Sequence, residues 1–353
     1  MKILYGVPSE GMGHATRSKV IITHLLKRHE VRIVTSDRAF AFMETNFPGL
    51  AHRIRGFHLG YRKGEISKRK TVAALLKKGP ADLIANVQQY RAIYAQFKPD
   101  LVISDFESFS YLFAKHHRLP IISIDNMQVL ARCTLEIPIP PQEKENHLIA
   151  RNIVKAKLPR CEAYLVTAFF DAPVEKPKTF IVPPILREPI LAAKAGVRQG
   201  EHIVVYQTSA SQQNLAEVLQ AIPDRTFFVY GFNKDEAAGN IVFKRFSEEG
   251  FIADLASADA VVTNGGFSLI SEAVYLHKPL CSVPIHGQFE QYVNGAYIEK
   301  LGFGRCFPAF EPDLIKAFLY DVPRFRSKIE GYQQEGNKTT FAVLDKVMEE
   351  LCP

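Results

Sequence analysis

Short apolar runs, rich in Val and Ile, recur through this chain and alternate with stretches of helical patterning. Such runs are typical of strands buried on both faces of a parallel sheet that helices cover. The runs expected as strands form a first series at 2–7, 30–35, 51–56, 101–104, 120–124 and 163–167, and a second series at 202–207, 226–230, 241–244, 260–263 and 280–284. Helices are expected near 16–27, 38–46, 83–97, 214–221, 268–275 and 339–351. The pattern predicts two α/β units, each built on a parallel sheet.

A proline-rich stretch from Pro173 to Pro189 separates the two series. Prolines stiffen the backbone and lack an N–H donor, so we interpret this stretch as the connection between domains. We expect an N-terminal domain over 1–180, a C-terminal domain over 181–324 and a final helical segment over about 325–353. A chain of 353 residues, 47% of them hydrophobic, is long enough to form two cores.

The segment 264–304 has the most specific pattern in the chain. Two glycines follow the expected strand 260–263, and a helix is expected to begin near Ser268. Glycines let the backbone approach a ligand closely, and the free N–H groups at a helix start attract an anion such as phosphate. Glu272 lies one turn further along the face of Ser268, where its carboxylate can accept hydrogen bonds from a diol such as ribose. The pattern predicts a nucleotide site.

A second strand and a polar loop follow within the same segment. The loop runs from His286 to Gln291 and opens another helix that is expected to end near Gly302. Glu290 and Gln291 together offer hydrogen-bond acceptors and a donor, which recognition of sugar hydroxyls requires. We expect this pair to bind the sugar.

This segment resembles the donor site of GT-B glycosyltransferases, in the UDP-glycosyltransferase and peptidoglycan GlcNAc-transferase superfamily (families 1 and 28). Where those families have a histidine that touches a donor phosphate, this chain has Asn264, and Leu269 stands at a threonine position. Phosphate contact would then depend on Ser268 and on backbone N–H groups. The resemblance is carried by Asn264, Gly265, Gly266, Ser268, Glu272, Pro279, Pro284, Glu290, Gln291 and Asn294.

The resemblance implies an α/β fold of the GT-B type, with two Rossmann-like parallel-sheet domains facing across a cleft and the C-terminal helix packing back on the first. It implies a hexosyltransferase that moves a hexose or N-acetylhexosamine from a nucleotide sugar, with UDP as the nucleotide, to an acceptor hydroxyl. Inversion at the anomeric carbon and independence of metals and cofactors are also implied. Phe251 is implied as a platform for the base. The donor contacts that the resemblance implies are Gly13, Thr208, Ser209, Phe251, Ile252, Asn264, Gly265, Gly266, Phe267, Ser268, Glu272, Glu290 and Gln291.

A glycine-containing loop follows the first expected strand and ends at His14. It does not complete a dinucleotide fingerprint, because Arg17 stands where Gly or Ala is needed, so a nicotinamide cofactor is not expected. His14 is placed where the carboxyl edge of a sheet meets a helix N-terminus, the usual ligand position in open α/β sheets. An imidazole there can take a proton near neutral pH.

The resembling families place a histidine of this loop next to the acceptor and orient it with an aspartate from a later strand end. Asp105 occupies that kind of position, so His14 and Asp105 are the expected catalytic pair. Asp125 and Asn126, at the end of the next strand, are alternatives for the orienting role. Glu10 is an alternative base, because a glutamate in a cleft can be tuned to that task.

The net charge of +7 is unevenly distributed, with a basic stretch between His52 and Lys78. This stretch is either a solvated surface or a patch that attracts an anionic or lipid-linked acceptor, or an anionic membrane surface. No nucleic-acid motif accompanies it, so nucleic acid is not an expected partner. The five cysteines lack C-x-x-C spacing, which argues against a structural zinc site. With no apolar run long enough to span a bilayer and no leader pattern, we expect a cytoplasmic protein, with peripheral contact at the inner face of the membrane as a further option.

Two other functions compete with sugar transfer. A UDP-sugar 2-epimerase-like enzyme would share the fold and would use carboxylates such as Glu10, Asp105, Asp125 and Glu290 around the sugar. A non-catalytic nucleotide-sugar-binding protein is the second alternative. The acceptor stays open among lipid-linked sugars, polyol-phosphate polymers, glycans and small natural products.

Overall fold

The computed structural model describes residues 1–9, 12–54, 61–62, 65–66, 88–207 and 214–353. The chain divides into two compact units. Unit 1 comprises Met1–Glu136, Leu148–Ile185 and Gly336–Pro353, and unit 2 comprises Ile137–His147 and Leu186–Glu335.

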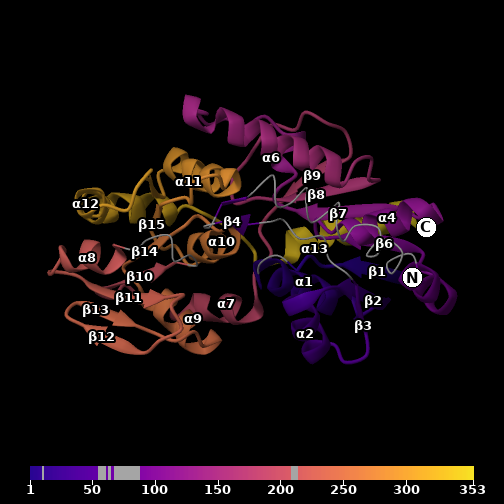
Figure 1. Ribbon diagram of the computed structural model, residues 1–353, viewed down its shortest axis with the longest axis horizontal. Helices are drawn as coiled ribbons and strands as arrows, with labels where there is room; N and C mark the ends of the chain where they lie inside the picture. Colours follow the sequence, from indigo (N-terminus) through magenta and orange to yellow (C-terminus); the bar gives the residue numbers. More distant parts are fainter. Residues whose placement is uncertain (10–11, 55–60, 63–64, 67–87, 208–213) are drawn as a thin grey trace. The chain divides into compact units, whose positions relative to one another are not determined.

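Unit 1 is built on a seven-stranded parallel sheet in the order β3-β2-β1-β6-β7-β8-β9 (Figure 1). The chain runs from β1 outward to β2 on one side, whereas β6 lies on the other side of β1. The carboxyl ends of β1 and β6 therefore flank the point where the strand order reverses, the typical ligand position in an open α/β sheet. The strands are β1 (Lys2–Gly6), β2 (Glu30–Thr35), β3 (Ala51–Arg53), β6 (Leu101–Ser104), β7 (Ile121–Asp125), β8 (Ala163–Thr167) and β9 (Thr179–Val182), and a separate pair joins β4 (Tyr61–Arg62) to β5 (Glu65–Ile66).

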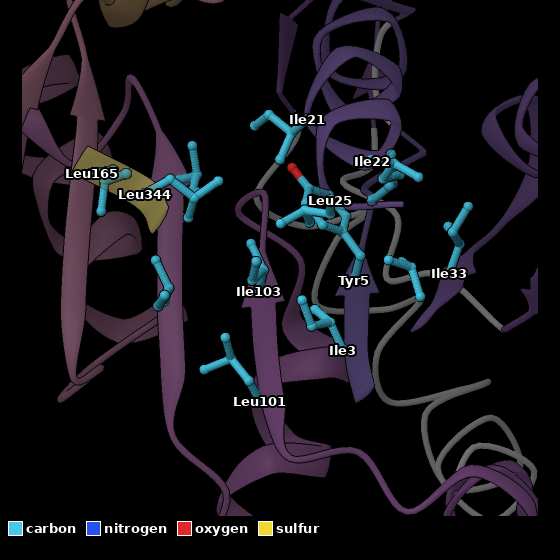
Figure 2. Packing of buried hydrophobic residues seen from close by; sticks show 14 of the residues in the cluster. Ile3, Tyr5, Ile21, Ile22, Leu25, Ile33, Leu101, Ile103, Leu165 and Leu344 are labelled. Atoms are coloured by element: carbon cyan, nitrogen blue, oxygen red, sulfur yellow. The ribbon is translucent and has the colours of Figure 1, made fainter. Parts of the chain in front are cut away.

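Helices pack on this sheet through apolar side chains. Figure 2 shows Ile21 and Leu25 of α1 packed with Tyr5 and Ile103 of the sheet, all of them buried. Burying one such aliphatic side chain stabilises a fold by about 1.5–3 kcal/mol. The helices of this part of the chain are α1 (Met12–Leu25), α2 (Asp37–Asn46), residues 88–97, α4 (Ser108–His117), α5 (Val129–Arg132), α6 (Lys144–Lys157) and α13 (Lys338–Leu351).

The last helix, α13, is part of unit 1. Its Leu344 joins the core near Leu165 (Figure 2). The Thr340 hydroxyl donates to the carbonyl of Pro183 at 2.8 Å, and His24 Nε2 lies 2.9 Å from Asp345 Oδ1. The end of the chain is thus held to unit 1 by packing and by polar contacts.

The boundaries of the units differ from those expected. Strand β9 lies inside the proline-rich stretch that we interpreted as a connection, and it belongs to a segment of unit 1 that ends only at Ile185. An edge strand pairs on one side only, so prolines next to it are tolerated. Residues 137–147 group with unit 2, and so do residues up to Glu335, so that the expected C-terminal segment 325–353 is shared between the units.

Unit 2 repeats the α/β plan with strand order β12-β13-β11-β10-β14-β15-β16, parallel throughout except for the β12–β13 pair. Its order reverses between β10 and β14. The strands are β10 (His202–Tyr206), β11 (Thr226–Tyr230), β12 (Glu236–Ala238), β13 (Ile241–Phe243), β14 (Ala260–Thr263), β15 (Leu280–Ser282) and β16 (Gly304–Cys306). The helices are α7 (Glu188–Ala193), α8 (Leu215–Gln220), α9 (Glu248–Ser257), α10 (Phe267–Tyr275), α11 (Phe289–Leu301) and α12 (Pro312–Ile329), with 3-10 turns at Pro141–Glu143 and Lys194–Gly196.

Lys278 is a buried cation in unit 2. It is 3% exposed, and its Nζ donates to the carbonyls of Arg198 at 2.7 Å and Ala258 at 2.9 Å. Burial, together with the nearby Arg326, lowers the pKa of Lys278 to about 8, while Asp259 opposes the change. The folded protein therefore gives up this proton at a lower pH than the unfolded chain does.

We expect Lys278 to make stability rise with pH between about 8 and 10.5, the ordinary lysine value. In that window the unfolded state binds more protons than the folded state, so raising the pH favours folding. The free energy of unfolding of the wild type minus that of Lys278→Met should grow by about 3 kcal/mol across the window. Urea denaturation at pH 7.5, 9 and 10.5 measures it, and the subtraction cancels the titration of cysteines and tyrosines. If the difference between the two free energies of unfolding did not change with pH, the lowered pKa of Lys278 would be contradicted.

Candidate active site

His14 and Asp105 meet at the reversal point of the unit 1 sheet. His14 lies in the first turn of α1, and Asp105 directly follows β6. His14 Nδ1 is 2.9 Å from Asp105 Oδ1. The His14 side chain is 23% exposed, whereas that of Asp105 is 1% exposed. The ring is anchored through Nδ1, and within the described part of the chain His14 Nε2 has no hydrogen-bond partner.

Arg17 is a buried part of the same site. It lies one turn after His14, and its Nε donates to Asp105 Oδ2 at 2.9 Å while Nη2 contacts Oδ1. Its Nη1 donates to Asn126 Oδ1 at 2.9 Å, and the Ser18 hydroxyl donates to Asp105 Oδ2 at 2.8 Å. In the sequence, Arg17 is only a break in a fingerprint. Its spacing of three residues from His14, which puts both side chains on one helix face, was the available signal.

Arg17 and Asp105 act on His14 Nδ1 in different ways. Burial disfavours the charged form of Asp105, but the Arg17 cation and His14 outweigh burial and hold its pKa well below the usual range. An ionised Asp105 can accept a hydrogen bond from Nδ1–H. Arg17 Nη2, 2.7 Å from Nδ1, can only donate. Nε2 is the basic atom of His14 only when the proton is on Nδ1 and faces Asp105.

The alternative residues lie differently. The Asp125 carboxylate accepts hydrogen bonds from the Ser123 hydroxyl and from the Gln128 N–H, both at 2.8 Å. Burial raises the pKa of Asp125 to about 6, an effect that the Arg17 cation opposes. Asn126 contacts Arg17, and Glu10 lies outside the described residues. Of the proposed orienting groups, Asp105 is the one in contact with His14.

A strained turn fixes Asp105 in place. Phe106 adopts a left-handed backbone with φ of 56°, which costs a non-glycine residue on the order of 1–3 kcal/mol. Glu107 then caps α4 by accepting hydrogen bonds from the N–H groups of Phe109 at 2.7 Å and Ser110 at 2.6 Å. At the end of β1, a Cβ on Gly6 would lie 2.1 Å from Ser110 Oγ. Glycine there lets the turn approach the sheet.

The glycine turn expected in unit 2 joins β14 to α10. Gly265 has φ of +95°, and its carbonyl accepts a hydrogen bond from Asn294 Nδ2 at 3.0 Å. Gly266 is exposed and is the N-cap of α10, whose second residue, Ser268, is half-buried. Asn264 and Phe267 are buried. The first N–H groups of a helix have no partner within it, so this turn can accept an anion.

Gly265→Ala should lower the free energy of unfolding by about 1–3 kcal/mol, because alanine is strained at positive φ and its Cβ would lie 2.8 Å from the carbonyl oxygen of Gln291. Gly266→Ala is the matched control, because that Cβ would meet nothing within 4 Å at an ordinary φ of −63°. Thermal and urea unfolding of both variants measure the effect. Equal stability of the two variants would contradict this account of the turn.

Glu272 is held by Arg187, a basic residue outside the expected site. Arg187 Nε donates to Glu272 Oε1 and Arg187 Nη2 to Oε2, both at 2.7 Å. Arg187 Nη1 donates to Glu248 Oε1, also at 2.7 Å. Burial raises the pKa of Glu272, and the guanidinium opposes that effect. The carboxylate expected to receive a ribose diol is therefore already paired at both oxygens.

The expected base platform lies inside an aromatic cluster. Phe251 is 3% exposed, and its ring packs against Tyr206, Tyr230 and Phe246. Ile252 is buried as well. Phe246 is 53% exposed and directly precedes Ser247, the N-cap of α9. Phe246 therefore offers the open ring of this cluster, which sequence reasoning missed because exposure depends on the fold.

The remaining predicted contacts lie as follows. Gln291 Oε1 accepts a hydrogen bond from the Ile285 N–H at 2.9 Å, and no described residue bonds its Nε2. Glu290 is half-buried in the first turn of α11. Gly13 precedes His14 in α1, so it belongs to unit 1. Thr208, Ser209 and most of the basic stretch 52–78 lie outside the described residues. No described helix is long and apolar enough to cross a membrane.

Comparison with known proteins identifies the family. A family model described as glycosyl transferase family 1 matches residues 1–323. The chain belongs to this family. It is a glycosyltransferase (EC 2.4), and glycosyltransferases of Methanosarcina acetivorans and Methanosarcina mazei, both named as uncharacterised, are each 24% identical to it over 98% of both chains.

Solved structures confirm the GT-B fold for this family 1 glycosyltransferase. Phytolacca americana UGT2, complexed with UDP-2fluoro-glucose and pterostilbene, matches with a TM-score of 0.70 and 14% identity over 99% of this chain and 98% of that one. The glycosyltransferase VinC in complex with dTDP matches with a TM-score of 0.64 and 15% identity over 99% and 100%. The expectation of two Rossmann-like parallel sheets is thus confirmed.

Proposed function

We propose that this glycosyltransferase moves a hexose or N-acetylhexosamine from a UDP-sugar to an acceptor hydroxyl, with inversion and without a metal. The supporting observation is the contact between His14 Nδ1 and Asp105, which leaves Nε2 with no partner among the described residues. His14 Nε2 takes the proton of the acceptor hydroxyl as that oxygen bonds to the anomeric carbon. Asp105 stabilises the imidazolium that forms.

The donor half of the proposal depends on unit 2. The bond between the anomeric carbon and the diphosphate breaks as the new bond forms, and the leaving UDP carries away the negative charge. The glycine turn, the first N–H groups of α10 and the Ser268 hydroxyl stabilise that charge, so no metal is required. Phe246 and the aromatic cluster beneath it receive the base. UDP-2fluoro-glucose in the Phytolacca americana enzyme and dTDP in VinC support a nucleoside diphosphate donor.

A donor panel tests the proposal. The protein is incubated with UDP-glucose, UDP-galactose and UDP-N-acetylglucosamine, together with soluble and lipid extracts, and the products are analysed by mass spectrometry. We expect release of UDP and an acceptor heavier by one sugar residue. A donor epimerised without acceptor would instead identify an epimerase, and donor binding without turnover in any mixture would identify a binding protein.

Gln291 is expected to hold the sugar through Nε2. Gln291→Glu retains an oxygen for the Ile285 N–H but removes the Nε2 donor, whereas Gln291→Ala removes both groups. Both changes should weaken UDP-hexose binding by about tenfold, the value of one good hydrogen bond, with much less effect on UDP. Calorimetric titration with each ligand measures this. Equal losses for UDP and UDP-hexose would show that Gln291 is structural only.

A further inference from the structure

The Arg187–Glu272 pair lies in the part of unit 2 where a ribose is expected. Glu272 is one turn along α10 from Ser268, and Arg187 immediately precedes α7. Figure 1 shows α7 beside α9, the helix that begins with Glu248. Glu248 is only two residues from Phe246, the open ring of the aromatic cluster. The guanidinium is therefore next to the residues proposed to bind the base and the diphosphate.

The pairing occupies two of the four lone pairs of the Glu272 carboxylate. The planar guanidinium donates to both carboxylate oxygens at 2.7 Å, which is the bidentate arrangement of Arg with a carboxylate. A third bond at 2.7 Å joins the same guanidinium to Glu248 and holds it in place. A ribose diol could reach these two lone pairs only after expelling the cation, and the other two belong to a buried side chain.

A diol is a poor replacement for that cation. Glu272 is buried, and a buried carboxylate that loses its charged partner is strongly destabilised. The diol is neutral, and it also gives up hydrogen bonds to water when it binds. The guanidinium should therefore stay on Glu272 when nucleotide binds.

We infer that Arg187 removes most of the selection for ribose hydroxyls, so that the donor site binds 2′-deoxyribonucleoside diphosphates about as well as ribonucleoside diphosphates. This inference rests on the proposed function, because it requires nucleotide to bind in unit 2. It extends the donor class from UDP-sugars to sugars carried by 2′-deoxyribonucleotides. Arg187 is then a specificity-determining residue that acts through Glu272.

The wild-type protein tests the inference directly. Calorimetric titrations with UDP and with 2′-deoxy-UDP differ only in the 2′-hydroxyl, and we expect dissociation constants within about fivefold of each other. A larger preference for UDP would overturn the inference and leave the proposed function standing. Absence of binding by both nucleotides would overturn the proposed function together with the inference.

Two variants separate this role from a structural one. A lysine ammonium is a single point charge that cannot occupy both oxygens in the plane, so Arg187→Lys frees part of Glu272 and should raise the preference for UDP over 2′-deoxy-UDP by about tenfold. Glu248→Gln is the matched control, because it weakens the outer contact of Arg187 and should leave the preference unchanged. An unchanged preference in folded Arg187→Lys would overturn the inference. If that variant does not fold, the wild-type comparison still decides.

Discussion

Replacing His14 by alanine should lower the rate of sugar transfer by about 10²–10⁴-fold, the usual contribution of a general base, while UDP binding is retained. The reason is that His14 Nδ1 faces the buried carboxylate of Asp105, while no described residue bonds Nε2. UDP is expected to bind in unit 2, whereas His14 belongs to unit 1. The measurements are kcat/KM with the acceptor found by the donor panel, and calorimetric titration with UDP.

His24→Ala is the matched control for the His14 variant. His24 lies on the same helix and also pairs with a carboxylate, with Nε2 2.9 Å from Asp345 Oδ1. It lies in the last turn of α1 and stacks on Phe341 of α13, away from the end of β6. We expect transfer to be retained in His24→Ala. Undiminished transfer in His14→Ala would refute the assignment of the base and turn attention to Glu10.

Arg17→Met should lower the free energy of unfolding at neutral pH by about 3–5 kcal/mol, the usual cost of removing one partner of a buried ion pair. Asp105 would keep its burial and its Ser18 hydrogen bond but would lose the cation that bonds both of its oxygens. Asn126 would lose its hydrogen bond from Arg17 as well. Urea denaturation measures the change. Arg17→Lys should retain only part of the stability that Arg17→Met loses, because an ammonium cannot make the forked contact with Asp105.

The pH dependence of stability gives a second readout for Arg17. In the wild type the pKa of Asp105 lies below its usual range, so its contribution is present above the ordinary aspartate value, about 4, and is lost as the pH falls below it. Without Arg17 the pKa of Asp105 is lowered less. The free energy of unfolding of Arg17→Met should therefore change less with pH in the acid range than that of the wild type.

Arg28→Met is the matched control for Arg17→Met. Arg28 follows α1, is 63% exposed and approaches Asp345 and Glu349 only at 3.9 and 3.8 Å. Exposed ion pairs contribute roughly 0–1 kcal/mol, so this variant should unfold nearly as the wild type does. If Arg17→Met were as stable as Arg28→Met, the network around Asp105 would not support the fold in the way described.

Much of the fold could be predicted because strands buried on both faces need continuous apolar runs. Strands 30–35, 101–104, 163–167, 226–230 and 260–263 have the expected bounds. The first part of helix α12, up to residue 324, was not expected, because Pro312 and Pro323 are helix-breaking residues in an isolated sequence. Pro312 begins the helix, where its missing N–H costs nothing, and the buried face from Ile315 to Phe325 stabilises the remainder. Strand β9 was missed for a similar reason, because it lies among prolines.

The candidate site was predictable where strand ends define it. His14 and Asp105 follow adjacent strands, and the carboxyl ends of parallel strands share one edge, so their contact follows from the order of the sheet. Arg187 could not be predicted in this way. It is 85 residues from Glu272, and no local pattern relates a residue before α7 to one in α10. The choice between Phe246 and Phe251 likewise depends on which ring the core covers.

The sequence by itself therefore determined the class of the fold, the glycine turn at 265–266 and the contact between His14 and Asp105, because apolar periodicity and strand–turn–helix junctions are local properties. The tertiary structure alone decided which charges are paired. Burial removes water from Asp105 and Glu272, and each then requires a cation at hydrogen-bond distance. Arg17 and Arg187 meet that requirement, and only folding brings Arg187 from the start of unit 2 to a helix far along the chain.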